Sequence, residues 1–366
     1  MSSSKQDGTA AAAAEQLGSM SLGESAERKD NGTEPTTKIG TNPTKFCSAC
    51  GEKSDALKKC NGCKCVWYCD KKCQNKHRKE HRKECKVITK ELDQRGGKLD
   101  VGTELDLGPI GTLPLQEECP ICMHVLPLND ALQTYSLCCG KTICGGCKFQ
   151  HRIKIINEND KRVQKKKPPV TPTCAFCRTT LPKSDEEKLA HLRNRVKRKD
   201  PESLANMARV HGDGELGLPV DEAKCIDLFR QSADLGFPDA YYQLGFFHCH
   251  GAMGLDQNDD ETLKYWEKAA ACGSLSARHN LGCVEETNGD FVAAMRHWRF
   301  SASSGARTSI NALFGFFALG RLHHSDLTKS LQAFYLARAE MKSEGRDQYI
   351  AYLKRTGEYE AEFDDL

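Results

Sequence analysis

Residues 47–85 read CSACGEKSDALKKCNGCKCVWYCDKKCQNKHRKEHRKEC, and the cysteine and histidine spacings in this stretch decide its fold. Eight side chains form four close pairs: Cys47 with Cys50, Cys60 with Cys63, Cys69 with Cys73, and His81 with Cys85. Structural zinc takes four Cys or His ligands in a tetrahedron. The stretch therefore predicts two zinc sites.

The order of the four pairs predicts how they are shared. Ligands four residues apart lie on one face of a helix, and a Cys-x-x-Cys turn places both sulfurs on one side. Interleaved pairs give one ion Cys47, Cys50, Cys69 and Cys73, and the other ion Cys60, Cys63, His81 and Cys85. Apolar residues are few here, so zinc binding, worth about 10–16 kcal/mol per structural ion, is expected to drive folding.

This segment resembles the MYND zinc finger. The resemblance rests on the run Tyr68-Cys69…Cys73-Gln74…His77…His81…Cys85, and all eight ligand positions match. It implies a module that binds short proline-containing peptides of partner proteins. Many such fingers have Trp after the first His, whereas this chain has Arg78, so an aromatic wall of the expected groove is missing. His77 and Cys65 are left over by the spacing and are interpreted as a surface histidine and a bystander thiol.

The first block is basic. Residues 45–90 hold 14 Lys or Arg and 5 Asp or Glu, although the whole chain carries a net charge of only +3. A local field of this sign attracts acidic peptides or phosphates. A solvated lysine-rich helix face is the alternative interpretation. A nucleic-acid-associated regulator rests on this charge alone, so nucleic acid is not the expected partner.

A second cysteine-rich block resembles a RING finger. Its cysteines are Cys119, Cys122, Cys138, Cys139, Cys144, Cys147, Cys174 and Cys177. In a RING finger the first, second, fifth and sixth ligands share one ion. The resemblance therefore assigns a third zinc ion to Cys119, Cys122, Cys144 and Cys147. It assigns a fourth zinc ion to Cys139, Cys174 and Cys177 together with one more ligand.

The remaining ligand of the fourth zinc ion has several candidates. RING fingers usually supply it as the His of a Cys-Gly-His sequence, but Lys141 stands there, and an ammonium has no lone pair for zinc. Cys138 is the most economical replacement, although adjacent side chains often point apart. His124 and His151 are the other candidates.

RING fingers commonly recruit a ubiquitin-conjugating enzyme charged with ubiquitin. The resemblance implies apolar contacts from Ile121 in the first Cys-x-x-Cys turn and Phe176 in the last. It also implies that Arg178, directly after the last ligand, helps to hold ubiquitin. Such ligases work by orienting a thioester and need no nucleophile of their own. No catalytic residue is predicted, and a zinc-stabilised docking surface without ligase activity remains an equal alternative.

The C-terminal half repeats itself. Asp239-Ala240…Leu244-Gly245 recurs 37 residues later as Ser276-Ala277…Leu281-Gly282. Gly236, Gly273 and Gly305 fit positions just past helix ends. Repeats of this length predict stacked helix pairs, and the pattern resembles Sel-one-like repeats, relatives of the tetratricopeptide family. Each unit is then expected to contact only its neighbours and to bind protein segments. Four cysteines without ligand spacing are expected to be buried: Cys225, Cys249, Cys272 and Cys283.

The cysteine count also bears on the compartment. Of 20 cysteines, 16 lie between residues 47 and 177. The N-terminal residues show no secretory signal pattern, and no run of about 18 apolar residues predicts a membrane span. An intracellular protein, cytoplasmic or nuclear, is expected. Thiols stay reduced there, so metal binding is favoured over disulfides.

The predicted fold is multidomain: two small zinc-stabilised cross-brace modules, then an all-α helical-repeat solenoid. The expected divisions are a disordered segment 1–44, a first finger 45–88, a linker 89–114, a second finger 115–182, repeats with a cap 183–355, and a tail 356–366. The predicted function is a zinc-binding interaction adaptor with about four zinc ions, whose finger binds a short peptide and whose repeats bind a larger client. The alternative is a RING-type ubiquitin ligase whose repeats recruit the substrate.

Overall fold

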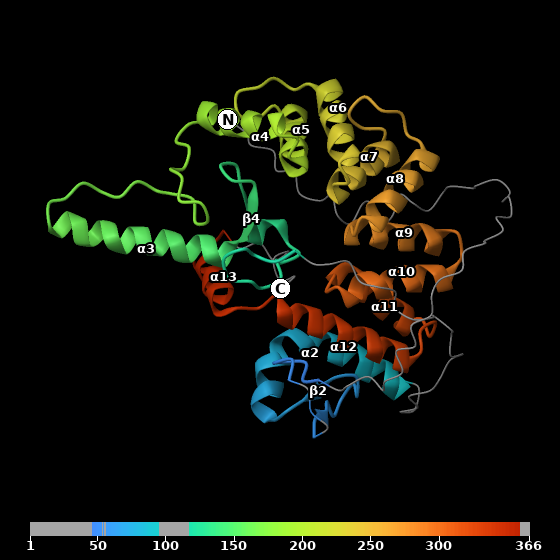
Figure 1. Cartoon of the computed structure of the whole chain (residues 1–366). Helices are drawn as coiled ribbons and strands as arrows, with labels where there is room; N and C mark the ends of the chain where they lie inside the picture. Colours follow the sequence, from blue (N-terminus) through green and yellow to red (C-terminus); the bar gives the residue numbers. More distant parts are fainter. Residues whose placement is uncertain (1–45, 53, 55, 95–116, 359–366) are drawn as a thin grey trace, which may run out of the picture.

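The computed structural model describes residues 46–94, apart from 53 and 55, and residues 117–358 (Figure 1). The segment expected to be disordered, most of the expected linker and most of the tail lie outside these residues. Two blocks with short strands come first. The first contains β1 (Lys58–Lys59), β2 (Trp67–Tyr68) and α2 (Lys71–Gln94). The second contains η2 (Asp130–Leu132), β3 (Gln133–Ser136), β4 (Lys141–Cys144) and α3 (Gly145–Gln164).

The rest of the described chain is helical, as the periodicity predicts. After α4 (Asp185–Lys197) come helices that stack in sequence order. They are α5 (Pro201–Asp213), α6 (Glu222–Asp234), α7 (Pro238–His250), α8 (Asp259–Ala271), α9 (Leu275–Thr287), α10 (Phe291–Ser303), α11 (Arg307–Ala318) and α12 (His324–Glu340). The last helix, α13 (Glu344–Thr356), packs on α3 instead. Among the helices of the described ranges, none has both the length and the apolar composition to cross a bilayer.

Glycines set the turns between repeat units. Gly236, Gly273 and Gly305 follow the C-caps of α6, α8 and α10, and all three have positive φ. This confirms their predicted place just past a helix end, where residues with a Cβ are disfavoured.

Small residues also allow the helices to approach closely. A Cβ on Gly245 would lie 2.5 Å from Cδ1 of Trp266, and one on Gly282 would lie 2.5 Å from Nε1 of Trp298. Both tryptophans are buried in the seams between units. The recurring Leu-Gly pair is thus explained by the indole that packs on it. Cys225 is buried as expected and Cys249 and Cys283 are partly buried, but Cys272, the C-cap of α8, is exposed, so the expectation is wrong for Cys272.

The helices α4–α12 follow an arc, and both zinc-finger blocks lie against it (Figure 1). The first block packs beneath α12. The second block sits between the two ends of the arc, next to α5 on one side and α13 on the other. The expectation that each repeat contacts only its neighbours is therefore wrong for both ends of the array.

One hydrophobic core joins the first block to the C-terminal helices. The finger contributes Val66, Ile88 and Leu92, and the helices contribute Trp298 and Phe334, among others. Because Leu92 is buried in this core, α2 continues to Gln94, beyond the end of the finger expected at residue 88.

Polar contacts reinforce the same interface. Nζ of Lys342 lies 2.9 Å from Oε1 of Glu80, and Nη1 of Arg307 lies 3.4 Å from Oε1 of Glu84. Both acidic residues lie on α2, and their partners lie near the ends of α11 and α12. These pairs are partly shielded from solvent, so they orient the finger on the helices more than a fully exposed pair does.

The second block is held from two sides. At the start of the repeats, the Tyr135 hydroxyl donates to Oδ1 of Asp200 (2.8 Å), and the Thr142 hydroxyl donates to Oε2 of Glu202 (3.0 Å). Burial raises the pKa of Glu202 to about 7, and the neighbouring charges of Glu117 and Asp200 add to this shift. The β3–β4 hairpin is thereby fixed to the N-terminus of α5.

At the other end, α13 packs on the start of α3. Arg346 donates from Nη1 to the carbonyl of Val125 at 2.6 Å. A Cβ on Gly146 would lie 2.7 Å from the backbone N of Arg346, so only glycine permits this approach. The second block thus connects the first repeat to the last helix of the described chain.

We predict that the first finger and the C-terminal helices unfold together. Ile88 is completely buried, whereas its neighbour Val87 is 44% exposed. Ile88→Ala should cost about 2–5 kcal/mol, because it leaves a cavity in the shared core. Hydrogen exchange in α12 should accelerate in Ile88→Ala and stay unchanged in Val87→Ala. Unchanged exchange in both variants would show that the finger does not stabilise the helices.

Candidate metal centres and interaction surfaces

The first candidate centre joins the start of the first block to the start of α2. Sγ of Cys50 lies 3.6 Å from Sγ of Cys69 and 3.8 Å from Sγ of Cys73. Cys47 completes the group, whose four sulfurs all lie within 4.8 Å of one another. Oδ1 of Asp70 accepts from the backbone N of Cys73 (2.8 Å), so a local cap starts the helix that carries this ligand.

The second candidate centre joins the β1–β2 region to the middle of α2. Sγ of Cys60 lies 3.7 Å from Sγ of Cys85, and Sγ of Cys63 lies 3.2 Å from Nε2 of His81. The other ring nitrogen of His81, Nδ1, lies 3.4 Å from the hydroxyl of Tyr335. A metal-bound histidine usually donates its second N–H to such a partner. The arrangement therefore leaves Nε2 of His81 for the metal.

The third candidate centre is built by the first turn of the second block and the β4–α3 junction. It groups Cys119, Cys122, Cys144 and Cys147. Sγ of Cys122 lies 3.8 Å from Sγ of Cys144, which also accepts from the backbone N of Cys147 at 3.4 Å. Nη2 of Arg346 lies 3.8 Å from Sγ of Cys122, so the last helix of the described chain contacts this group directly.

The fourth candidate centre groups Cys138, Cys139, Cys174 and Cys177. Sγ of Cys138 lies 3.3 Å from Sγ of Cys177. The two adjacent cysteines occupy the loop of the β3–β4 hairpin, where Gly140 has φ +65°. The bend at Gly140 brings the sulfurs of Cys138 and Cys139 to the same side of the loop, where they meet Cys174 and Cys177.

The alternative ligands of the fourth centre are engaged elsewhere. Nε2 of His151 lies 3.1 Å from the carbonyl oxygen of Thr173, and Nδ1 of His124 lies 2.7 Å from the carbonyl oxygen of Cys122. Lys141 is exposed in β4. The structure therefore brings together all sixteen predicted ligands in four groups, with Cys138 as the sixteenth. Metal binding by each of these residues remains a prediction.

The spacing of the sulfurs fits structural zinc. A tetrahedron with Zn–S bonds of about 2.3 Å places neighbouring sulfurs about 3.8 Å apart. Four sulfur pairs of the first three groups lie 3.6–3.8 Å apart, and the Cys138–Cys177 pair of the fourth group lies closer, at 3.3 Å. A zinc ion bound in this way supplies structural cross-links, because four protein ligands leave no open position for chemistry.

The two residues left over in the first block are buried, so the interpretation of His77 as a surface histidine is wrong. Its ring lies edge-on against Tyr335 at 4.3 Å between centroids, and its Nδ1 lies 3.0 Å from the Tyr68 hydroxyl. Burial is the main cause that lowers the pKa of His77 to about 3. Sγ of Cys65 lies 3.1 Å from Nε2 of His324.

The sequence alone did not predict which residues outside the two blocks contact the candidate centres. Tyr335, His324 and Arg346 come from the last helices of the array and contact the two blocks. More than 200 positions separate each of these residues from its partner. No local spacing or periodicity signals such contacts.

The three predicted ubiquitin-enzyme contacts are on the surface. Ile121 and Phe176 are exposed apolar side chains in the two Cys-x-x-Cys turns, and Met123 adds a third. Arg178 is also exposed, with Nη1 2.7 Å from Nδ1 of His151. Its cation and desolvation of the ring both lower the pKa of His151, with desolvation the larger cause. An apolar surface and a positioned cation are therefore present on the second block.

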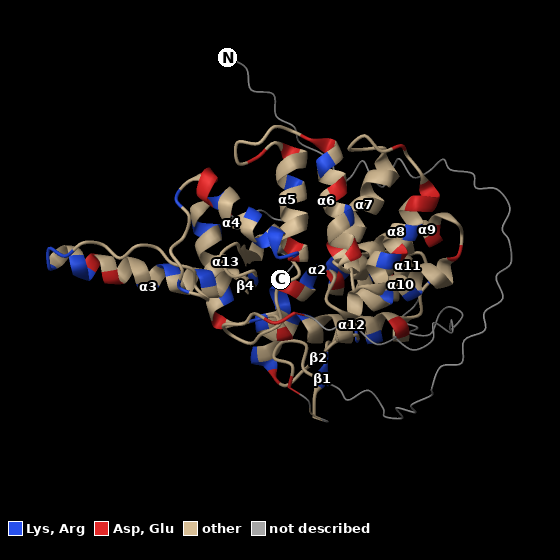
Figure 2. Ribbon diagram, turned by 45° about the horizontal axis from the view of Figure 1, so that its top comes forward, with Lys and Arg blue, Asp and Glu red and all other residues tan. Residues whose placement is uncertain are grey.

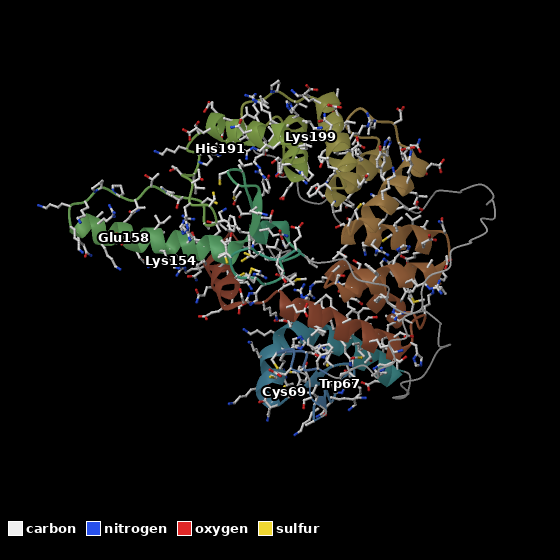
Figure 3. The ribbon with its side chains drawn as sticks, in the orientation of Figure 1. Trp67, Cys69, Lys154, Glu158, His191 and Lys199 are labelled. Atoms are coloured by element: carbon white, nitrogen blue, oxygen red, sulfur yellow. The ribbon has the colours of Figure 1, made fainter. Side chains whose placement is uncertain are left out.

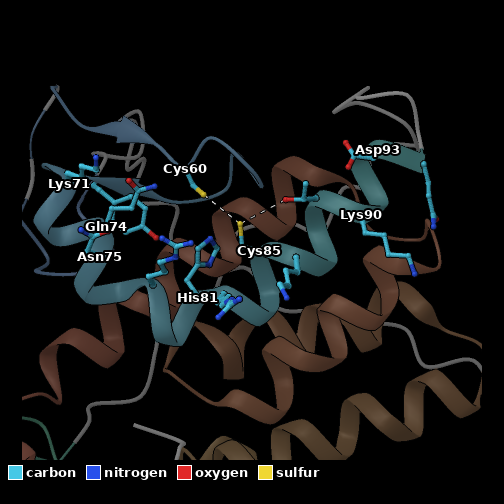
Figure 4. A pocket seen from close by; sticks show the side chains of 14 residues that line it. Cys60, Lys71, Gln74, Asn75, His81, Cys85, Lys90 and Asp93 are labelled. Carbon is cyan, nitrogen blue, oxygen red and sulfur yellow. Dashed lines mark hydrogen bonds between the residues drawn. The ribbon is translucent and has the colours of Figure 1, made fainter.

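A groove of about 770 Å³ runs along the outer face of α2 (Figure 4). Five cations line it: Lys71, Arg78, Arg82, Lys86 and Lys90. Asp93 is the single acidic residue among the described residues that line the groove. In Figure 3, the finger lies below the arc, with Trp67 and Cys69 labelled at its lower edge. The groove thus faces away from the core that α2 shares with the helices.

A second cavity, of about 920 Å³, lies between the second block and the repeats. The starts of α7, α9 and α11 line it at Pro238, Leu275 and Arg307. Tyr135 and Thr142 line the opposite side from the β3–β4 hairpin. The inner surface of the array is therefore partly covered by the chain's own second block.

Comparison with known proteins identifies two parts of the chain. Residues 47–85 match the MYND finger, and residues 201–237 and 238–274 each match a Sel1 repeat. The chain thus contains a zinc-finger-type module and helical repeats. More particularly, these are a MYND finger and Sel1 repeats, as the sequence predicted. The resemblance of the second block to a RING finger remains a prediction.

Solved structures of repeat proteins are also similar. A Sel1 repeat protein from Oxalobacter formigenes is 25% identical, with 34% of this chain and 96% of that chain covered and a TM-score of 0.31. A protective antigen of uropathogenic Escherichia coli strains, which displays an SLR fold, is 20% identical. The match covers 50% of this chain and 40% of that one, with a TM-score of 0.35.

We predict that purified protein holds about four zinc ions per chain, one for each group of four ligands. Cys138→Ser should lower the content to about three, because it removes one ligand of the fourth centre. Cys65→Ser is the matched control, since Cys65 is buried but lies outside the four groups. Elemental analysis after gel filtration measures the content. About four ions in Cys138→Ser would exclude Cys138 as a ligand.

Proposed function

We propose that the protein is a zinc-dependent interaction scaffold whose MYND finger binds an acidic peptide segment of a partner protein. The observation that carries this proposal is the basic groove on α2. Its cations recur at residues 71, 78, 82, 86 and 90, a spacing that places them along one side of the helix. Within the described residues, no acidic side chain forms an ion pair with any of the five.

The chemistry of the groove favours carboxylates over an apolar proline segment. Arg78 stands where many MYND fingers have Trp, so the wall of the groove is a guanidinium that donates to carboxylates in a fork. Tyr68 remains at the floor, and Gln74 and Asn75 add amide groups for backbone contacts. A short segment with several Asp or Glu residues matches this lining.

The repeats provide the second binding surface in this proposal. The cavity between the second block and the array has room for a peptide segment, and it carries both Arg209 and Asp239 on the repeat side. A client segment bound there would contact the β3–β4 hairpin as well as the array. The second block is then part of the client surface.

Peptide binding tests the role of the finger. Fluorescence anisotropy with a labelled Asp/Glu-rich peptide should show binding to zinc-loaded protein. Lys86→Glu should weaken the affinity about tenfold or more in about 0.1 M salt, because it replaces attraction by repulsion at short range. Lys83→Glu is the matched control, since Lys83 is exposed on the same helix but does not line the groove. An equal loss of affinity in both variants would show that only non-specific charge attraction holds the peptide.

A ubiquitin ligase is the second candidate function. It is favoured by the exposed Ile121 and Phe176 in the two turns of the second block and by Arg178 after the last cysteine. Ligases of this kind accelerate transfer by restricting the bound thioester to a reactive orientation. The second block needs no further catalytic group for this role.

A discharge assay tests the ligase hypothesis. Zinc-loaded protein is mixed with a panel of ubiquitin-charged conjugating enzymes, and loss of the thioester is followed in time. If the block is a ligase, Ile121→Ala and Arg178→Ala should each slow discharge about tenfold or more, because each removes a contact that orients the thioester. Leu319→Ala, at an exposed position of the array, should have no effect. If no enzyme of the panel is discharged, the ligase hypothesis is rejected and only the scaffold function remains.

A further inference from the structure

Helix α3 extends well beyond the second block and forms an arm (Figures 1 and 2). Only its first half is covered by α13. The ring of Phe149 lies 5.7 Å from that of Tyr349 and 4.9 Å from that of Tyr352. Lys154 and Glu158 are labelled on the part of the arm that extends away from α13 (Figure 3).

The two helices cross where they meet. Gly145, the first residue of α3, faces the ring of Tyr349 in the second turn of α13, whereas Gly146 faces the backbone of Arg346 in its first turn. Because Tyr352, one turn before the end of α13, contacts Phe149, the end of α13 lies near the base of the arm. Burial is the main cause that raises the pKa of the Tyr349 phenol; the charge of Glu358, directly after the Gly357 cap, adds to this shift, and the charge of Arg152 on α3 opposes it.

The face of α3 that α13 covers continues along the arm. Phe149, Ile153, Ile156, Asp160 and Val163 follow one another at spacings of four and three residues, so they share one side of the helix. Ile156 is 43% exposed and Val163 is 68% exposed. Apart from Asp160 the face is thus apolar, and Ile156 and Val163 are uncovered beyond the contact with α13.

Another side of the arm is already occupied. The returning segment 168–173 is fixed by Asn159, whose Oδ1 accepts from the backbone N of Val170 at 2.6 Å. Nη1 of Arg162 donates to the carbonyl of Pro168 at 3.0 Å. These contacts cover the side of the helix that carries Asn159 and Arg162, but they leave Ile156 and Val163 exposed.

The arm is also basic. Residues 152–167 hold seven Lys or Arg and two Asp or Glu. Three of these cations, Lys165, Lys166 and Lys167, directly follow the last residue of the helix. An occupant of this face should therefore combine apolar side chains with negative charge.

The sequence that follows α13 has this composition. Residues 358–366 read EYEAEFDDL and contain five acidic residues. Tyr359, Phe363 and Leu366 are spaced by four and three residues, the pattern of an apolar helix face. Nine residues span about 14 Å as a helix and about 30 Å when extended. From Phe149 the arm measures about 10 Å to Ile156 and about 21 Å to Val163, so a helical segment is long enough to reach Ile156 and an extended one is long enough to reach Val163.

We propose that residues 359–366 bind the exposed Ile156–Val163 face of α3 in the same chain, next to α13. The apolar side chains Tyr359, Phe363 and Leu366 cover Ile156 and Val163, and the acidic residues face the cations of the arm. The segment thereby closes a surface that would otherwise attract other acidic, apolar segments.

Photo-cross-linking in the full chain tests this proposal. Zinc-loaded protein carrying benzoylphenylalanine in place of Phe363 is irradiated, and the linked peptides are identified by mass spectrometry. Cross-links should join position 363 to residues 153–164. Val163→Glu should reduce their yield about fivefold or more, because it places a charge like that of the segment on the apolar face. Leu319→Glu, at a site that is 67% exposed, should leave the yield unchanged.

Two further measurements test whether residues 359–366 of the same chain, and no other segment, cover the exposed face of α3. Mixing isotopically labelled and unlabelled chains distinguishes links within a chain from links between chains, and links between chains would overturn the proposal in favour of a second copy. Hydrogen exchange of residues 153–164 should accelerate at least threefold when the chain ends at Glu358. Unchanged exchange, or cross-links only to other regions, would overturn the proposal.

Discussion

The convergence of Cys and His side chains into four close groups is the constraint on which the two N-terminal blocks depend. Each block has few apolar residues for a core of its own, and its strands are only two to four residues long. Each group draws its side chains from turns that are distant in sequence, so a zinc ion bound there would cross-link the short hairpins to the starts of α2 and α3.

The core that α2 shares with the C-terminal helices also decides which side of the first finger faces solvent. Since α2 buries Ile88 and Leu92 against the C-terminal helices, its opposite side must face solvent. That side carries the five cations of the groove. The orientation of the finger on the array therefore decides which surface is available to a partner, and the basic face is the available one.

The second block has a comparable double attachment. Glu202 and Asp200 at the start of α5 bind the hairpin, and Arg346 of α13 binds its first turn. The block thus connects the two ends of the array and narrows its inner surface. It leaves Ile121 and Phe176 exposed, so the apolar surface expected of a RING-like module is accessible.

The sequence by itself determined the local features. The ligand pairs, the glycines after the repeat helices and the Leu-Gly pairs beneath the indoles follow from short-range geometry, because each depends on a turn or on one helix face. The sequence left Cys138, His124 and His151 as candidates for the last ligand of the fourth centre, because the bend at Gly140 that brings Cys138 to the group does not follow from the residue order.

Only the tertiary structure decided how the parts are assembled. The contacts of Tyr335 with His77 and His81, and of Arg346 with the second block, join residues more than 200 positions apart. The burial of His77 and the extension of α2 to Gln94 both result from packing on α12 and its neighbours. Apolar burial is non-directional, so the composition of a segment shows that it needs a partner but does not show which partner it meets.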